Sequence, residues 1–254
     1  MLPHEAGSNT REISMANETH LSILKDRDVA EWNIWRLEHV NVRPDLAGAD
    51  LSNGNWTGAD FRGAEMSGTI FRRATLRSAV FCDAILAGAV LREADLQGAV
   101  LYGADLAGAD LARANLSGTD LCGTKLVEAN LEAADLSRAV MFHSNITRAR
   151  MEGTRLDRAN MTGATLAGAN LRNAVLNDAQ LTWADLSGAD LEHAVLKGAS
   201  VNEVNLRGAC LRGADLRQAS LCQSDLNGAA LEGANLEGTD LSDARRTEGA
   251  ERRG

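Results

Sequence analysis

The stretch AVLYGADLAGADLARANLSGTDLCGTKL, residues 99–126, carries a leucine at every fifth position from Leu101 to Leu126. A spacing of five fits neither regular element, because an amphipathic helix needs apolar residues at a mean spacing near 3.6 and an alternating strand needs them at 2. The same step, continued from Leu46 to Leu241, meets 40 positions that are all apolar, 30 of them Leu. The repeat therefore runs through most of the chain without an insertion.

The other positions of the five-residue unit are also restricted. The residue two before the large apolar one is Ala in 30 of 40 units, the residue just before it is Asp or Asn in 21, and the residue two after it is Gly in 20. Two apolar residues separated by one polar residue form the shortest alternating strand, and the polar or Gly pair that follows suits a turn. Such short strands become stable only when the chain coils and each strand pairs with the coil below.

The unit Ala104-Asp105-Leu106-Ala107-Gly108 and its tandem copies over residues 44–243 resemble the pentapeptide-repeat family. The resemblance implies an all-β solenoid, a right-handed quadrilateral β-helix with four repeats in each coil. The 40 units would then make about ten coils. With about 4.8 Å between stacked strands, the rod would be about 48 Å long.

The chain divides into four predicted segments: a disordered N-terminus (1–16), a helical N-terminal cap (17–43), the β-helix (44–243) and a frayed polar C-terminus (244–254). In the cap, Asp28 followed three residues later by Glu31 resembles a capping box, and Val29, Trp32 and Trp35 share one helical face. A solenoid exposes apolar core at its ends. We therefore expect these three residues to cover the first coil, and the alternative is a dimerisation or partner helix.

The composition limits the cellular setting. The chain has 254 residues and a net charge of −9, with no apolar run long enough to cross a membrane and no apolar signal core among its first residues. The cysteines, whose spacing fits no zinc motif, are Cys82, Cys122, Cys210 and Cys222. In the coil arrangement Cys82 and Cys122 share a column but lie two coils, about 10 Å, apart, which is too far for a disulfide. Free thiols agree with a reducing compartment, so we expect a cytoplasmic protein.

The sequence offers little chemistry for catalysis. None of the five histidines has a ligand or nucleophile partner at a meaningful spacing. The recurrent Gly-x-Asp belongs to the repeat and matches neither a calcium-binding β-roll nor a nucleotide-binding loop. We expect the repeated Asp and Asn to bond the backbone near the corners, with metal ladders as the less favoured alternative. The sequence therefore predicts no enzyme, no metal and no cofactor.

The resemblance implies a possible partner. The best-understood relatives are quinolone-resistance and self-immunity proteins, which are thought to imitate duplex DNA and bind DNA gyrase or topoisomerase IV. The net charge of −9 fits this role, as does an acidic last coil that contains no Lys or Arg. Its candidate acidic partner surface comprises Asp225, Glu232, Glu237, Asp240 and Asp243. These relatives dimerise through an apolar C-terminal helix, which the polar segment DARRTEGAERRG does not resemble.

Charge density tempers this hypothesis. The repeat region holds 26 acids and 17 bases, whereas duplex DNA of about 48 Å would carry about 28 negative charges. A basic cluster also interrupts the acidic surface: Arg138, Arg148, Arg150, Arg155 and Arg158. The function hypothesis is therefore a DNA-mimicking topoisomerase binder that gives resistance or immunity to topoisomerase poisons. The alternative is a general interaction scaffold or regulatory protein without DNA mimicry, and in neither case do we expect direct binding to nucleic acid or membrane.

One face of the predicted coil carries outward apolar residues in adjacent coils. Stepping by twenty aligns a candidate interface of Val80, Val100, Tyr102, Val140 and Phe142, interrupted by Asp120. Outward Val can simply reflect strand propensity, but exposed Tyr and Phe indicate a covered surface. The sequence therefore predicts a contact surface here and allows a weak homodimer.

Overall fold

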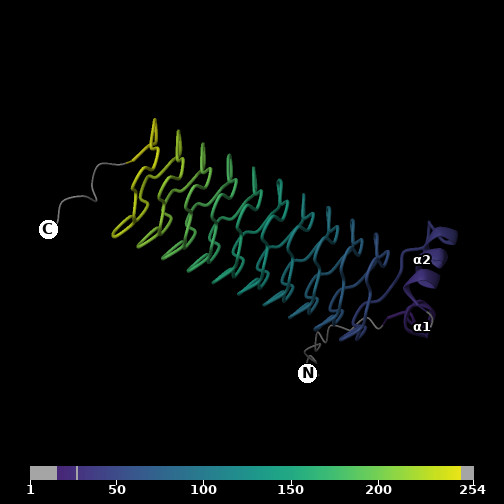
Figure 1. The fold of residues 1–254 in the computed structure, drawn as a ribbon. Coiled ribbons are helices and arrows are strands. Elements are labelled where there is room, and N and C mark those ends of the chain that lie inside the picture. Colours follow the sequence, from purple (N-terminus) through teal and green to yellow (C-terminus); the bar gives the residue numbers. More distant parts are fainter. Residues whose placement is uncertain (1–15, 27, 247–254) are drawn as a thin grey trace, which may run out of the picture.

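The computed structural model describes residues 16–26 and 28–246. Two helices, α1 (Glu18–Asp26) and α2 (Val29–Glu38), lie at one end of a long rod of stacked coils (Figure 1). The sheet contacts of the rod are single-residue parallel bridges at every fifth residue, from Asp45 to Arg245. Each bridge pairs a residue with the one twenty positions further, as Asp105 pairs with Lys125. Four pentapeptides therefore separate one bridge from the next in the same column.

The predicted terminal segments fall mainly outside the described residues, which exclude 1–15 and 247–254. At the C-terminal side, the ladder of bridges extends to Arg245, which pairs with Asp225, two residues past the predicted end of the β-helix. At the N-terminal side, both helices lie within residues 17–43. The side chain of Asp28 accepts a hydrogen bond from the Glu31 N–H at 2.8 Å, so Asp28 is the N-cap of α2.

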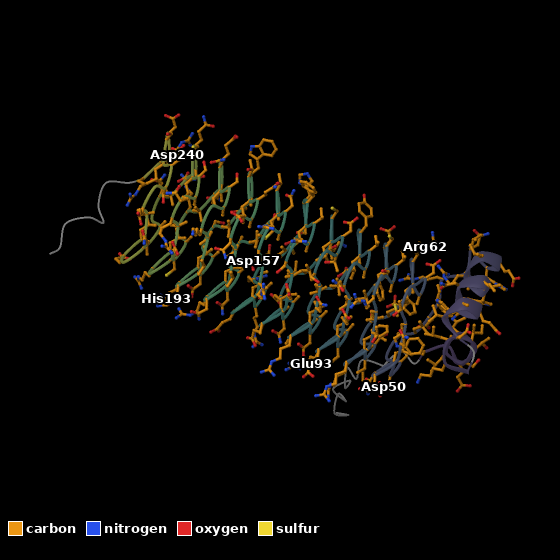
Figure 2. All side chains as sticks on the ribbon, viewed as in Figure 1. Asp50, Arg62, Glu93, Asp157, His193 and Asp240 are labelled. Carbon is orange, nitrogen blue, oxygen red and sulfur yellow. The ribbon has the colours of Figure 1, made fainter. Side chains whose placement is uncertain are left out.

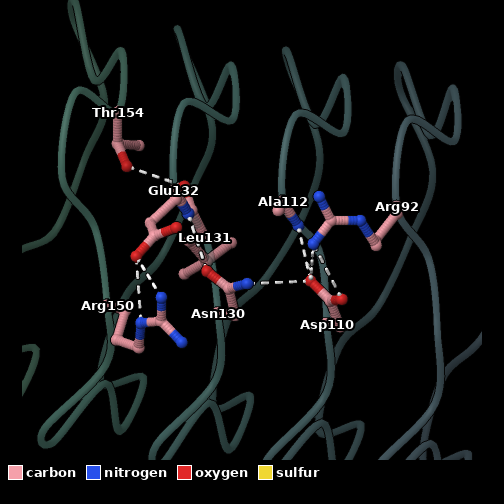
Figure 3. A network of polar contacts seen from close by, with 8 residues as sticks. All are labelled: Arg92, Asp110, Ala112, Asn130, Leu131, Glu132, Arg150 and Thr154. Atoms are coloured by element: carbon pink, nitrogen blue, oxygen red, sulfur yellow. Dashed lines mark hydrogen bonds and ion pairs between the residues drawn. The ribbon is translucent and has the colours of Figure 1, made fainter.

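Both inward positions of the repeat are buried. Ala104 and Leu106 are 0% exposed, and the same holds within a few per cent for their equivalents in most coils. Where Thr or Ser replaces the inward Ala, its hydroxyl donates to a backbone carbonyl. Thr154 donates to Leu131 O at 2.8 Å (Figure 3), and Thr69 donates to Leu46 O at 2.7 Å. These hydroxyls are thus buried without losing their hydrogen bonds.

The backbone of one pentapeptide shows why Asp or Asn recurs before the large residue. The bonds of the unit 106–110 are Leu106 N–H to Lys125 O (2.7 Å), Ala107 N–H to Asp105 Oδ1 (3.1 Å), Gly108 N–H to Val127 O (2.9 Å), Ala109 N–H to Leu106 O (3.0 Å) and Asp110 N–H to Ala89 O (2.9 Å). Three N–H groups bond neighbouring coils and one closes the turn. The remaining N–H is bonded by the Asp side chain, which confirms the prediction that these residues bond the backbone.

Every turn contains a residue in the left-handed region, two positions after the large apolar residue. The φ angle there lies between 53° and 72°, at 20 glycines and at 20 other residues. Glycine adopts this conformation freely, but a residue with a Cβ loses about 1–2 kcal/mol in it. Half of the turns therefore hold a side chain in a strained backbone conformation.

Ala133, with φ 54°, provides a test of this strain. We expect Ala133→Gly to raise the free energy of unfolding by up to about 1 kcal/mol, because the relief of strain exceeds the added chain entropy. The control Ala107→Gly, at a turn position outside the left-handed region, should lower it by about 0.5–1 kcal/mol. Thermal unfolding measures both, and a loss of stability in both variants would contradict the prediction.

Candidate interaction surfaces

At the N-terminal end of the rod, side chains of α2 make the hydrogen bonds to the first coil that a preceding coil would make. Asn33 Oδ1 accepts from the Asp60 N–H at 2.8 Å, and Trp32 Nε1 donates to Asp60 O at 2.8 Å. Arg36 donates to the turn carbonyl of Arg62 at 2.6 Å. One coil further along, the equivalent backbone groups bond the preceding coil. The helix therefore satisfies an edge that would otherwise expose unpaired backbone groups.

The first helix and the apolar side chains complete this cover. His20 Nδ1 accepts from the Asp45 N–H at 3.1 Å. Of the three residues predicted to form the cap, Trp32 is fully buried, and Val29 and Trp35 are half-buried against the core. The Trp32 ring lies 5.9 Å from that of Phe61 and 5.3 Å from that of Trp35. The structure thus places all three at the end of the first coil.

The residues of the predicted candidate interface lie side by side in the structure. Parallel bridges join Val80 to Val100, Val100 to Asp120 and Asp120 to Val140, so these residues form one column. The three valines are half-buried. Beside them, Tyr102 is 55% exposed and Phe142 is 37% exposed.

Sequence reasoning missed a third aromatic residue of this surface, Trp183, which is 62% exposed. It lies in the turn 181–184, two coils beyond the turn of Phe142, but one position later in that turn. Stepping by twenty from Tyr102 meets Thr182 instead, and only a search of both turn positions finds the tryptophan. We call Tyr102, Phe142 and Trp183 the aromatic ridge. They are the large apolar side chains that are exposed among residues 44–246.

The predicted acidic surface divides into two parts. Asp225 pairs with Arg207 at 3.2 Å, and Glu232 pairs with Arg212 at 3.2 Å. The other three acids, Glu237, Asp240 and Asp243, make no ion pair within the described residues. Hydrogen bonds from Ser242 lower the pKa of Asp240, which lies toward the C-terminal end of the rod (Figure 2).

The predicted basic cluster is largely neutralised. Its ion pairs join Arg148 to Glu128 (3.3 Å), Arg150 to Glu132, Arg155 to Asp157 (3.6 Å) and Arg158 to Asp178 (3.7 Å). The pair of Arg150 and Glu132 belongs to a polar network that continues through Asn130 and Asp110 (Figure 3). A site for phosphate or an acidic partner is therefore not favoured here, because the guanidinium groups already have carboxylate partners.

Within residues 16–26 and 28–246, no three His, Cys, Asp or Glu side chains lie close enough to hold a metal ion. The four cysteines are free thiols, and burial raises the pKa of Cys82 and of Cys122. In the described part of the chain, neither helix has the length and apolar character needed to span a bilayer.

Comparison with known families agrees with this repeat geometry. The family model for pentapeptide repeats matches residues 45–77, 74–112, 104–141, 114–153, 140–178, 174–213 and 209–245. The chain belongs to the pentapeptide-repeat family. No curated protein sequence matches it.

Solved structures of other pentapeptide-repeat proteins are similar to this chain. HetL from the cyanobacterium Nostoc sp. strain PCC 7120, which is involved in the regulation of heterocyst differentiation, is 34% identical; the match covers 77% of this chain and 86% of HetL, with a TM-score of 0.38. QnrB1, a plasmid-mediated fluoroquinolone resistance protein, is 18% identical; the match covers 79% of this chain and 94% of QnrB1, with a TM-score of 0.38. A protein of the Arabidopsis thaliana thylakoid lumen is 29% identical over 52% of this chain and 72% of its own, with a TM-score of 0.16.

The cap of this pentapeptide-repeat protein should respond to pH through His20. Burial lowers the pKa of His20 from its usual 6.5, against the opposing effect of Asp45, and Arg36 lowers it further. Because the unfolded chain binds the proton more tightly, the stability that neutral His20 contributes is complete above about pH 6.5 and is lost as the pH falls below it. We expect the fluorescence of the cap tryptophans to report loosening between about pH 7 and about pH 5.

Two variants separate this effect from general acid sensitivity. His20→Gln should flatten the response, because its amide cannot be protonated in this range. His193→Gln, at an exposed residue remote from the cap, should leave the response unchanged. If the His20 variant loosens over the same pH range as the unaltered protein, another group controls the transition.

Proposed function

We propose that this protein is a non-enzymatic interaction rod, and most concretely that it binds a type II topoisomerase, DNA gyrase or topoisomerase IV, in the place of DNA. The observation that carries the proposal is the set of three acids in the last coil, Glu237, Asp240 and Asp243, which lack ion pairs within the described residues. Proteins that bind duplex DNA contact its phosphates mainly through Lys and Arg. Carboxylates that make no ion pair, at one end of a rod, present negative charges that a basic surface of this kind can bind.

The net charge of −9 supports the same role. A protein of this kind would compete with DNA for the enzyme and so give resistance or immunity to topoisomerase poisons. We place it in the cytoplasm, in agreement with its four free thiols. Its partner would be a protein, and no direct contact with nucleic acid is part of the proposal.

The alternative is a general interaction scaffold or regulatory protein without DNA mimicry. The distribution of charge favours this alternative, because the net charge of −9 is about a third of that of duplex DNA of the same length. Ion pairs also neutralise much of the remaining surface, including the pairs of Arg148 with Glu128 and of Arg207 with Asp225.

We propose that the rod itself, whichever function it serves, is a right-handed four-sided β-helix of about ten coils over residues 44–243. Twenty residues separate bridged positions, and each pentapeptide contributes one bridge and one turn, which supports four sides. We also propose residues 17–43 as a cap that covers the first coil, with the segment 1–16 outside the β-helix; at the other end, the bridge of Arg245 with Asp225 extends the rod two residues beyond 243.

A DNA gyrase assay tests the topoisomerase proposal. The protein should reduce the DNA cleavage that a fluoroquinolone induces, and the triple variant Glu237→Gln, Asp240→Asn, Asp243→Asn should lose at least about tenfold in potency, because it removes three charges that a basic surface would contact. The amides keep the hydrogen-bonding shape of each side chain, including the Asp240 bond to the Ser242 N–H.

The control variant Glu18→Gln, Glu38→Gln, Glu152→Gln removes the same charge from exposed positions elsewhere and should keep its potency. Loss of potency in both variants would assign the effect to net charge. If the unaltered protein changes neither supercoiling nor cleavage at micromolar concentration, the scaffold alternative stands for this enzyme.

A further inference from the structure

The aromatic ridge has a regular spacing. Tyr102, Phe142 and Trp183 lie in the turns 101–104, 141–144 and 181–184, which are forty residues and therefore two coils apart. At about 4.8 Å between stacked strands, neighbouring aromatic side chains are about 10 Å apart along the rod. The turn between the first two carries only Cys122 and Gly123, and nothing lies within 4 Å of where a Cβ of Gly123 would be. The equivalent space at Gly163, between Phe142 and Trp183, is filled by the His143 ring, whose Nδ1 lies 2.6 Å from where a Cβ would be, so the ridge has one gap, over Cys122 and Gly123.

The turns at this corner of the solenoid carry no charged residue over five successive coils, although two carboxylates border them: Asp120 accepts from the Cys122 N–H at 3.0 Å, and Asp83 lies beside Gly103. The turns 101–104, 121–124, 141–144, 161–164 and 181–184 contain no Lys, Arg, Asp or Glu. Charges return immediately beyond them, with Asp83 before and Glu203 after. At each of the other three corners, the turns of the same coils contain charged residues. Depletion of charge around exposed aromatic side chains is the composition of a protein interface core.

We propose that the aromatic ridge is the contact surface of a homodimer in which two rods lie antiparallel and an aromatic side chain of each fills the gap over Cys122 and Gly123 of the other. A partner that packs along this corner must present groups at multiples of the same strand spacing. A second copy does so by construction, because both rods have the same bridge register. An antiparallel arrangement is closed by a two-fold axis, the commonest symmetry of protein dimers.

The two rods can be offset along each other in three ways that place an aromatic residue in the gap. These three registers differ in which of the aromatic residues enters it. If the rods are offset by an odd number of coils, Tyr102, Phe142 or Trp183 of one copy lies opposite Cys122 of the other. In each register an aromatic ring faces small residues, whereas an even offset would bring two bulky side chains together. The five turns span about 19 Å along the axis. This patch is small beside standard interfaces, so the dimer is weak and forms at high concentration.

Disulfide trapping at Cys122 tests the arrangement. In a background with Cys82, Cys210 and Cys222 replaced by Ser, Cys122 is the sole remaining thiol. Tyr102→Cys, Phe142→Cys and Trp183→Cys are each placed in a chain that also carries Cys122→Ser, so that no disulfide can form between stacked coils of one rod. Each is then oxidised with an equal amount of the Cys122 protein in mildly alkaline solution, because burial raises the pKa of the Cys122 thiol. We expect one of the three to form a covalent dimer with the Cys122 protein at least about tenfold faster than the other two, and Cys122→Ser in that second chain to remove the fast reaction.

A cysteine at an exposed position on another corner, Glu128→Cys in the same Cys122→Ser chain, serves as the matched control and should react no faster than the slow pair. Sedimentation of the protein with all native cysteines supplies the second readout. It should show concentration-dependent association that Tyr102→Ser, Phe142→Ser, Trp183→Ser abolishes while the far-UV spectrum is kept. None of these variants alters the acidic last coil, so this result is independent of topoisomerase binding.

Three outcomes overturn the proposal: equal trapping of all three cysteines at the rate of the control, association that survives the triple Ser variant, or a protein that stays monomeric at millimolar concentration. The last outcome, combined with loss of another protein's binding in the triple variant, would assign the ridge to a different partner.

Discussion

The rod depends on the need of every backbone N–H for an acceptor. In most five-residue units of the interior coils, neighbouring coils and the turn bond four of the five N–H groups, as they do in the unit 106–110. The fifth follows the large apolar residue, and the Asp or Asn just before that residue supplies its acceptor, as Asp105 does for Ala107 at 3.1 Å. An unsatisfied buried donor costs about 1–3 kcal/mol. This explains the frequency of Asp and Asn, and where another residue stands, the N–H lies in a surface turn that water can reach.

The same requirement shapes the N-terminal end. A hydrophobic lid would cover Leu46 and Phe61 but leave the edge of the first coil unpaired. The cap provides both, because Trp32 packs on Phe61 and donates its indole N–H to Asp60 O at 2.8 Å. Asn33, next to it, accepts from the Asp60 N–H. The first coil therefore meets α2 with the hydrogen bonds of another coil, which joins the helix to the rod through directional contacts as well as apolar ones.

The period of five was sufficient to predict the coiling and the inward and outward positions, because these follow from backbone geometry and burial. The helix before the rod was predicted separately, from the capping box at Asp28 and the apolar face of Val29, Trp32 and Trp35. The surface was less predictable. Stepping by twenty finds neighbours in one column, but long Arg side chains reach diagonally to a carboxylate eighteen residues away, as Arg150 reaches Glu132 and Arg207 reaches Asp225. Such pairs depend on side-chain conformation, which the repeat does not determine. Trp183 was missed because it occupies the next turn position after the column of Tyr102.

Because the inward side chains and the backbone bonds between coils hold the rod together, the outer residues can vary freely, and their spacing along the rod is limited to multiples of about 4.8 Å. This limit separates the two kinds of partner. Duplex DNA carries a charge about every 1.7 Å, so carboxylates on this rod cannot imitate its phosphates group for group. Mimicry would have to act through the overall field of an acidic end, which is sensitive to salt. Packing at the aromatic ridge is different, because a large side chain of one partner must face the gap on the other. A second rod meets this requirement, since its coils have the same spacing.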